Sequence, residues 1–283
     1  MQSLKDIKTK ITSYQKTGAV THAMEAVSAV KMRKSQQRSI STRPYAAAAQ
    51  EILERLSEPA MRGTYPLMQT REGKTLMIVV TSDKGLAGAL NSAVIKRAEK
   101  EIADRNLTKS DVIVIAMGRR GGEYFTSRGY DVHEKYENMS DDATEADMRL
   151  ITDKVLTWHA EGIFGTAVMV YTHFKNTFEQ NPSVRQIIPI MPPAATKNSA
   201  HKIEPDPEDV LRALLPKLLN IAVYHGLLES KASEHSARMV AMKSATDKAK
   251  DMAATFTRTF NKARQAAITR EVSEIVGGIE AMK

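Results

Sequence analysis

Cysteine is absent from this chain of 283 residues, tryptophan occurs once, and aromatic residues make up only 5% of it. A chain without cysteine has no disulfide framework, no thiol nucleophile and no Cys-ligated zinc or iron–sulfur site. So few aromatic side chains also argue against a β-sandwich and against a stacking platform for single-stranded nucleic acid. The longest apolar runs, such as residues 76–80, are much shorter than the ~20 residues of a transmembrane helix. The charged segment Met1–Thr9 is unlike a signal peptide, so we expect a soluble, basic protein of a reducing compartment.

Positive charge is concentrated at the two ends of the chain, which carries 41 Lys and Arg against 33 Asp and Glu, a net charge of +8. Residues 1–57 hold ten basic and four acidic residues (+6), residues 58–207 hold 19 and 20 (−1), and residues 208–283 hold 12 and 9 (+3). Basic ends around a neutral middle indicate one basic structure built from both termini. We therefore expect an N-terminal helix over 1–57, a central domain over 58–207 and a C-terminal helix over 208–283.

The two ends have few helix breakers and show heptad spacing. No proline precedes Pro44 and none follows Pro216, so we expect long helices, with a kink or interruption near Pro44. Residues spaced alternately by three and four predict the seam of a left-handed coiled coil. In the C-terminal helix these are Met239, Met242, Thr246, Ala249, Ala253, Phe256, Phe260, Ala263 and Ala267. In the N-terminal helix Leu4, Ile7, Ile11, Tyr14, Gly18 and Thr21 have this spacing, and Met24 and Val27 continue the stripe in steps of three.

After Ala267 the apolar stripe slips by one residue and continues as Ile268, Val272, Ile275 and Ile279. A slip rotates the seam, so we expect the final turns to leave the partner helix. The simplest assembly is an antiparallel coiled coil of the two terminal helices. The alternative is two amphipathic helices packed separately on a globular core.

The middle of the chain reads as a small α/β domain. Apolar runs predict strands over 75–82, 111–117 and 165–174, and a weaker edge strand over 184–190, which contains Pro189. Helices are expected over 87–104, 119–127 and 144–160, and flexible joints over 59–73 and 176–207. Strands that alternate with helices are typical of a doubly wound, mostly parallel sheet of the Rossmann-like kind. The fold class is therefore α/β, with this domain between the two helices of the coil.

One turn in this domain is a candidate phosphate-binding loop. Residues 82–91, SDKGLAGALN, follow the first strand and open a helix, a place where backbone amides can bind phosphate. The segment matches neither the P-loop nor the dinucleotide-binding pattern, and a tight turn with glycines for packing is the favoured interpretation. The seven histidines lack the i, i+4 spacing of a helical metal site. We predict no cofactor, no metal and no catalytic group, and hence no enzyme acting alone.

The basic residues of the terminal helices allow three interpretations. Lys31, Arg33, Lys34 and Arg38 form a patch in the first helix, and the last helix carries Lys243, Lys248, Lys250, Arg258, Lys262, Arg264 and Arg270. Such residues form a solvated helix face, bind a nucleic-acid backbone, or meet acidic loops of a protein partner. Acidic residues such as Asp247 and Glu271 are interspersed among them, which disfavours nucleic acid.

Two helical segments and the turn resemble a known family. Residues 232–282, ASEHSARMVAMKSATDKAKDMAATFTRTFNKARQAAITREVSEIVGGIEAM, resemble the C-terminal signature of the γ subunit of F-type ATP synthases. Residues 21–36, THAMEAVSAVKMRKSQ, and the turn SDKGLAGALN are similar to other motifs of the family, and the EPDP stretch at 204–207 precedes its long helix. The likeness covers essentially the whole chain, and its C-terminal block is highly specific.

The resemblance implies a rotor shaft in the central stalk. It implies a coiled coil inside a ring of three α and three β subunits, a central domain packed on the ε subunit and the membrane c-ring, and no active site in the chain itself. Ion flow would turn ring and shaft together and so drive ATP synthesis, or the reverse. The expected location is the cytoplasmic face of the bacterial plasma (inner) membrane, held there as a peripheral protein.

The resemblance also implies contacts, residue by residue. Those with the α/β ring are Met24, Lys31, Arg238, Lys243, Arg264, Gln265, Thr269 and Glu271; the apolar tip in its sleeve is Ile275, Val276, Ile279 and Met282. One departure from the family is Gly18 inside the first helix, which puts the regularity of that helix in doubt. The competing hypotheses are a stand-alone α/β nucleotide-binding protein that uses residues 82–91 and a basic coiled-coil nucleic-acid binder.

Overall fold

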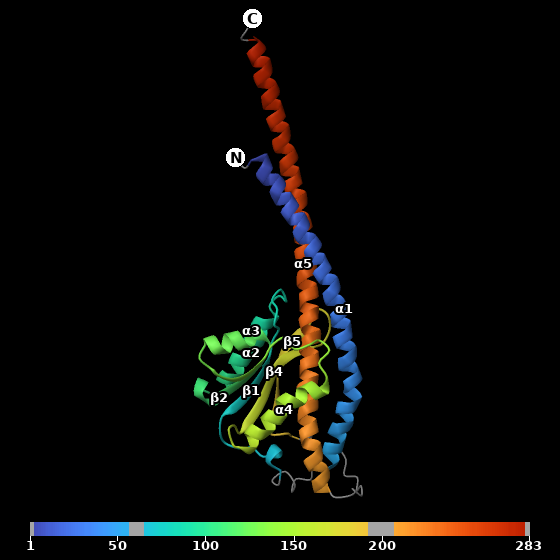
Figure 1. The fold of residues 1–283 in the computed structure, drawn as a ribbon, viewed down its shortest axis with the longest axis vertical. Helices are drawn as coiled ribbons and strands as arrows, with labels where there is room; N and C mark the ends of the chain where they lie inside the picture. Colours follow the sequence, from blue (N-terminus) through green and yellow to red (C-terminus); the bar gives the residue numbers. More distant parts are fainter. Residues whose placement is uncertain (1–2, 57–64, 192–206, 281–283) are drawn as a thin grey trace. The chain divides into compact units, whose positions relative to one another are not determined.

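The computed structural model describes residues 3–56, 65–191 and 207–280. The chain divides into two compact units, which are described separately. The coil unit comprises Met1–Ser28 and Met239–Lys283, and the sheet unit comprises Ala29–Arg238. Two long helices, α1 (Leu4–Leu56) and α5 (Pro207–Glu280), contribute residues to both units (Figure 1).

In the coil unit the two helices run antiparallel and pair through their seams. The hydroxyl oxygens of Thr21 and Thr246 lie 2.7 Å apart in a buried hydrogen bond. Seven residues away on α1 and ten away on α5, the rings of Tyr14 and Phe256 stack with their centroids 5.5 Å apart. Because the partner's number rises as the α1 number falls, the pairing is antiparallel, as predicted.

The predicted seam of α5 is confirmed, and that of α1 needs one correction. All nine seam residues from Met239 to Ala267 are buried or half-buried, and the predicted exit after Ala267 is confirmed by Ile268 and Val272, which are more than half exposed. In α1, the prediction that Val27 belongs to the seam was wrong, because Val27 is 55% exposed whereas Ser28 is 3% exposed. Ser28 stands seven residues after Thr21, and its hydroxyl donates a hydrogen bond to the carbonyl of Met24, which satisfies it in the seam.

Helix α1 is continuous at the two places where the sequence put its regularity in doubt. It runs through Gly18, which lies in the seam facing Ala249. The interruption expected near Pro44 is wrong, because the helix continues to Leu56. A proline removes a single N–H from the ladder of helix hydrogen bonds, and Pro44 lies at an exposed position where water can solvate the carbonyl left without a partner.

The sheet unit contains five strands in the order β3-β2-β1-β4-β5. The strands are β1 (Thr75–Val80), β2 (Val112–Met117), β3 (Asp131–Tyr136), β4 (Thr166–Phe174) and β5 (Gln180–Ile188). Between them lie the α-helices α2 (Leu90–Asp104), α3 (Arg119–Ser127) and α4 (Glu145–Ala160) and the short 3-10 helices η2 (Pro66–Met68) and η3 (Lys109–Asp111). Strands β1 to β4 are parallel and β5 pairs antiparallel with β4, which confirms the mostly parallel α/β fold.

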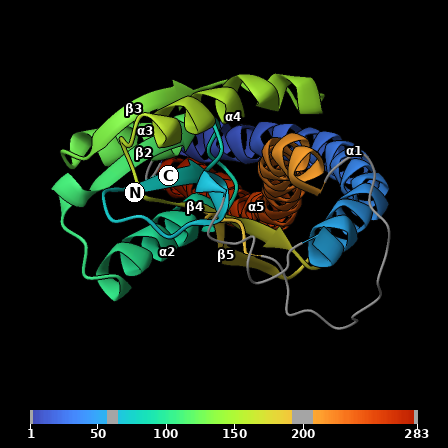
Figure 2. The same cartoon turned by 90° about the horizontal axis from the view of Figure 1, so that it is seen from below.

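The helices cover both faces of this sheet (Figure 2). Alternate residues of the central strands point to opposite faces, so Ile78 packs with α4 and α5 while Met77 packs with α2 and α3. Gly226 brings α5 close to β4, since a Cβ there would lie 2.6 Å from the Met169 side chain. The sheet is therefore doubly wound, with α5 as one of its layers.

Two strands differ from prediction. The edge strand β3 was missed because its sequence DVHEKY has no apolar run and alternates between exposed and half-buried positions. Strand β5 does lie at the opposite edge, as Pro189 suggested, but it begins at Gln180 and not at 184. Its polar first half fell within a segment expected to be a flexible joint. No helix of the described ranges is both long enough and apolar enough to cross a membrane.

Candidate partner-binding surfaces

The predicted contact residues of the coil unit lie on the exposed surface of α5. Lys243, Arg264, Gln265, Thr269 and Glu271 are all exposed. The Thr269 hydroxyl donates to the carbonyl of Gln265 in its own helix at 2.9 Å. Spacings of four and seven residues place Gln265 beside Thr269, and Arg264 in line with Glu271. The structure thus brings Arg264, Gln265, Thr269 and Glu271 together on neighbouring faces of one helix, whereas Lys243 lies 21 residues, about 30 Å, nearer the start of α5.

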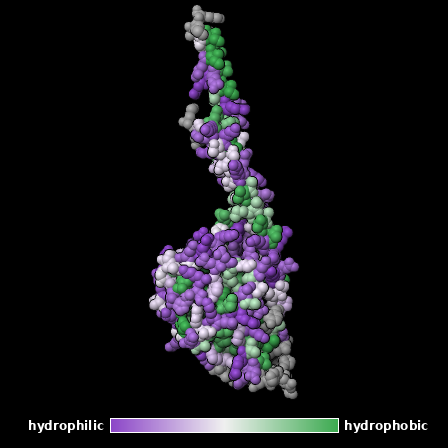
Figure 3. Space-filling view, in the orientation of Figure 1, coloured by the Kyte–Doolittle hydropathy of each residue, from purple (hydrophilic) through white to green (hydrophobic). Residues whose placement is uncertain are grey.

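The predicted apolar tip is exposed as well. Ile275 is 64% exposed, Val276 54% and Ile279 55%, and Met282 lies outside the described residues. Figure 3 shows hydrophobic and hydrophilic surfaces side by side at this end of α5. Three large aliphatic side chains within two turns of a helix form a surface that favours an apolar partner.

The remaining predicted contacts, Met24, Lys31 and Arg238, are less accessible. Met24 is half-buried in the coil unit. Lys31 donates to the Asp141 carboxylate at 2.7 Å. Arg238 is 8% exposed and forms a salt bridge of 2.8 Å with Glu234. Lys31 and Arg238 therefore already have partners inside the sheet unit, and contacts of all three with another subunit stay predictions.

Asp141, in the loop before α4, is the centre of a charge cluster that no sequence motif indicated. One of its carboxylate oxygens lies 2.9 Å from Nε2 of His235 and 3.7 Å from Nζ of Lys231, both on α5, and the other accepts from Lys31 on α1. The hydrogen bonds from His235 and Lys31 hold the pKa of the Asp141 carboxyl far below its usual value, against the opposing effect of burial. The loop before α4 thereby ties α1 to α5 within the sheet unit.

The neighbouring Asp142 extends this cluster along α1. Lys34 and Arg38 both lie 2.7 Å from its carboxylate, and Arg38 also donates to the backbone carbonyl of Asp141 at 2.9 Å. The spacing of Lys31, Lys34 and Arg38 by three and four residues was the one sequence signal of a shared face. Much of the basic patch predicted on the first helix is thus paired within the chain.

The turn of residues 82–91 is stabilised by its own side chains. The Asn91 side-chain oxygen accepts from the backbone N–H of Ser82 at 2.9 Å, and the Ser82 hydroxyl donates to the carbonyl of Lys84 at 2.6 Å. The Asp83 carboxylate accepts from the backbone N–H of Arg119 at 3.0 Å, at the start of α3. Side chains of the turn are thus bonded to its own backbone and to the start of α3, so the geometry favours a structural turn.

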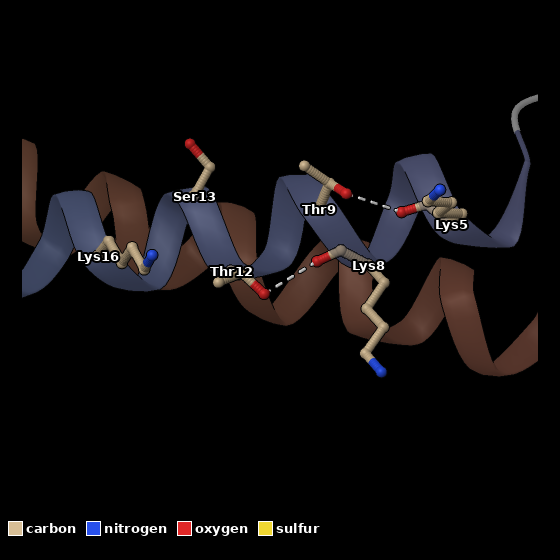
Figure 4. A pocket seen from close by; sticks show the side chains of 6 residues that line it. All are labelled: Lys5, Lys8, Thr9, Thr12, Ser13 and Lys16. Atoms are coloured by element: carbon tan, nitrogen blue, oxygen red, sulfur yellow. Dashed lines mark hydrogen bonds between the residues drawn. The ribbon is translucent and has the colours of Figure 1, made fainter.

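A groove on α1 also fails to make an anion site. It is lined by Lys5, Lys8, Thr9, Thr12, Ser13 and Lys16. The hydroxyls of Thr9 and Thr12 donate to carbonyls of their own helix, and the lysine ammonium groups point in different directions (Figure 4). Across the described part of the chain, no group of three or more acidic or histidine side chains is placed to hold a metal ion.

Comparison with known proteins decides among the remaining interpretations. A family model described as ATP synthase matches residues 3–282. The curated ATP synthase gamma chain of Pelotomaculum thermopropionicum is 39% identical over 288 residues, and the match covers both chains completely. This chain belongs to the ATP synthase gamma-chain family.

Solved structures agree with membership of the gamma-chain family. The chain is similar to one in the central stalk/c-ring structure of Tetrahymena thermophila mitochondrial ATP synthase, with 26% identity, a TM-score of 0.64, and coverage of 80% of this chain and 99% of that one. A chain in the OSCP/F1/c-ring structure of the Euglena gracilis enzyme gives 18% identity, a TM-score of 0.69, and coverage of 99% and 94%. The second likeness supports the fold alone. The resemblance inferred from the sequence motifs is confirmed.

Proposed function

We propose that this gamma chain is the central-stalk rotor of its ATP synthase and transmits torque between an ion-driven c-ring and the catalytic β subunits. The observation that carries the proposal is the full-length match to a gamma chain, joined to two long helices that pair antiparallel in the coil unit. The chain is then a non-catalytic subunit of an enzyme complex. Its partners are the α and β subunits, the ε subunit and the c-ring.

The mechanical requirements of a shaft support this reading. A shaft that carries torque needs paired helices with few breakers, and the described part of α5 has no proline after Pro216. A shaft must also present different faces to chemically identical catalytic subunits. The outer turns of α5 are suitable, because the charged Arg264 and Glu271 are followed within the next turns by the exposed aliphatic side chains of Ile275 and Ile279.

The proposed contacts with the α/β ring are those expected from the sequence: Met24, Lys31, Arg238, Lys243, Arg264, Gln265, Thr269 and Glu271, with Ile275, Val276, Ile279 and Met282 as a tip in an apolar sleeve. Charged side chains exposed on a helix attract acidic loops weakly enough to be released at every step. Undirected apolar contacts at the tip resist rotation little.

The same proposal includes the division of the chain at residues 57 and 207 into helix, domain and helix. It also includes a peripheral location at the inner face of a bacterial plasma membrane.

Co-purification tests the assignment itself. The chain is isolated from its native membrane with mild detergent, and the accompanying subunits are identified and counted by mass spectrometry. We expect three α and three β subunits for each copy of this chain. A free chain with a bound nucleotide, or a chain retained on DNA at low salt, would contradict the proposal.

A double substitution tests the contact face. Arg264→Ala with Gln265→Ala removes two exposed side chains from α5 without touching its seam, so we expect a stable fold and a lower rate of ATP synthesis in membrane vesicles. Arg212→Ala, also exposed on α5 but in the sheet unit, is the matched control and should leave the rate unchanged. Full activity of the double variant would remove these two residues from the contact face.

A further inference from the structure

Strand β4 extends beyond its neighbour β1 and has an open edge there. Its pairing with β1 ends at Val170, whereas its pairing with β5 continues to Phe174. Within the extension, Thr172 stands opposite Pro182 of β5, which has no N–H to donate. At such a pair of an antiparallel ladder the backbone groups point away from the partner strand. The N–H and C=O of Thr172 therefore face the open edge, and because Thr172 is 2% exposed they need partners within the protein.

Helix α5, which runs beside β4 and β5 (Figures 1 and 2), supplies those partners through two serines. The backbone N–H of Thr172 donates to the Ser230 hydroxyl at 3.2 Å, and the Ser233 hydroxyl donates to the Thr172 carbonyl at 3.3 Å. Ser230 is 7% exposed and Ser233 is fully buried, so water competes little for these bonds. Two helix side chains thus take the place of a neighbouring strand.

A third serine of α5 holds the turn of the β4–β5 hairpin. The Ser236 hydroxyl, which is fully buried, donates to the Thr177 carbonyl at 2.8 Å and accepts from the side-chain amide of Gln180 at 3.3 Å. Ser230, Ser233 and Ser236 are spaced by three residues and so lie on one side of the helix. They are called the serine clamp below.

The clamp requires α5 to lie very close to the strand, because a serine side chain is short. One turn before Ser230, Gly226 allows this approach, since a Cβ there would lie 2.6 Å from the Met169 side chain. Between the first two serines, Ala232 is also fully buried. Alanine favours a helix more than serine does, so helix propensity does not account for three buried serines within seven residues. The bonds to the hairpin do account for them.

The other contacts between α5 and this face of the sheet are largely apolar. Leu219, Val223 and Leu227 are buried in the core cluster that joins α5 to the strands. Apolar burial has no preferred direction, so it resists separation more than it resists turning of the helix about its axis. Hydrogen bonds depend on distance and angle. The serine clamp therefore fixes both the rotation and the axial position of α5 on the sheet.

The clamp stands near the point where α5 leaves the sheet unit. Both α1 and α5 continue from the sheet unit into the coil unit, α5 directly after Arg238. Helix α1 is held to the loop before α4 by ion pairs with Asp141 and Asp142 that are partly exposed, and exposed ion pairs are weak. Of the two connections, α5 therefore has the more rigid attachment to the sheet unit.

We propose that Ser230, Ser233 and Ser236 are positioning residues that lock α5 to the β4–β5 hairpin and so carry torque from the sheet unit into the coil unit. The proposal rests on the proposed rotor function and names the contact through which the load passes. A helix that could turn on its own sheet would yield at each step. Buried directional bonds hold the helix and the sheet in register under load.

Angular fluctuation of single rotors measures this lock. Because the chain has no cysteine, Leu150→Cys on α4 provides one site for a gold particle on the sheet unit, while α and β subunits fixed to a surface hold the coil unit. The mean-square angular fluctuation of the particle, recorded in the pauses between steps at low ATP concentration, falls as the torsional stiffness rises. In Ser230→Ala with Ser233→Ala it should increase about twofold or more, because a buried strand backbone loses both its bonds to α5. Ser236→Ala should give a smaller increase.

Three control variants separate the lock from general effects. Ser127→Ala removes an exposed hydroxyl that bonds within α3. Val114→Ala opens a small cavity in the core on the sheet face opposite α5 and so lowers stability without removing a bond to that helix. Ser230→Thr retains the hydroxyl. All three should leave the angular fluctuation near that of the native serines, and thermal melts give the loss of stability of each variant.

An angular fluctuation in the double serine variant equal to that of the native serines would overturn the proposal. An equal increase in Val114→Ala would also overturn it, since loss of stability alone would then loosen the rotor. If the double variant does not assemble with α and β, Ser236→Ala decides, and an unchanged fluctuation there would refute the lock. Complexes with the native serines that hydrolyse ATP without directed steps would instead overturn the rotor assignment.

Discussion

Replacing Asp141 by asparagine removes the charge at the centre of the cluster in the sheet unit. Two of its partners on α5 are nearly inaccessible: the side chain of His235 is 4% exposed and that of Lys231 12%. Breaking a buried pair by removing one partner costs roughly 3–5 kcal/mol because the other charge stays uncompensated. The Asp141 side chain is itself 24% exposed and asparagine retains an acceptor oxygen, so we expect a loss of about 2–3 kcal/mol in the free energy of unfolding.

Urea unfolding of the full chain at pH 7, followed by circular dichroism, measures this loss. Asp142→Asn is the matched control, because Asp142 and its partner Lys34 are both more than half exposed and exposed pairs contribute little. An equal effect of the two substitutions would refute the argument, since it would mean that burial of the partners does not decide the strength of the pair.

The pH dependence of the same variant follows from the lowered pKa of Asp141. A carboxyl whose pKa is lower in the folded state than in the unfolded state stabilises the fold above the unfolded value, near 3.8, and loses that contribution as the pH falls further. The difference in stability between the native chain and Asp141→Asn should therefore shrink as the pH falls below about 4. A difference that grew as the pH fell through this acid range would contradict this sign.

Two further predictions concern the coil unit. Gly18→Ala should raise its melting temperature, because the new Cβ would lie 3.5 Å from that of Ala249, an ordinary contact, and alanine favours a helix by about 1 kcal/mol over glycine; a lower melting temperature would show that the helices cannot accept a methyl group there. Phe256→Ala should destabilise the coil because the ring stacks on Tyr14 and lies beneath the Lys10 ammonium at 5.3 Å. A double-mutant cycle with Tyr14→Ala should give a coupling of about 0.5–1.5 kcal/mol, and no coupling would contradict the stack.

Helix bounds and the coiled-coil seam could be predicted from the sequence, because they depend on residues close together in the chain. Helix α3 begins and ends where its sequence indicated, and the seam of α5 follows its heptads at all nine predicted positions between residues 239 and 267. Val27 was wrong because the prediction followed apolar character, whereas the heptad from Thr21 leads to Ser28, whose hydroxyl is satisfied within its own helix. Strand β3 was missed because an edge strand with two half-accessible faces has no apolar run.

Contacts between residues distant in sequence could not be predicted from heptad spacing or short motifs. The bond between Lys31 and Asp141 spans 110 positions, and that between Arg238 and Gly85 spans 153. Heptads and motif spacing carry no information on such pairs, so Lys31 and Arg238 were assigned to a partner subunit when each already has a partner in the sheet unit. The exposed residues Arg264 and Gln265 were assigned from family resemblance alone, and their contacts stay predictions.

Rotation of single molecules tests torque transmission most directly. Leu150→Cys, exposed on α4, takes a bead or gold particle, and the chain is assembled with α and β subunits fixed to a surface. On addition of ATP we expect the particle to turn continuously in one direction, at a rate that rises with ATP concentration. Hydrolysis of ATP by the same immobilised complexes without directed rotation would contradict the role of this chain as a shaft.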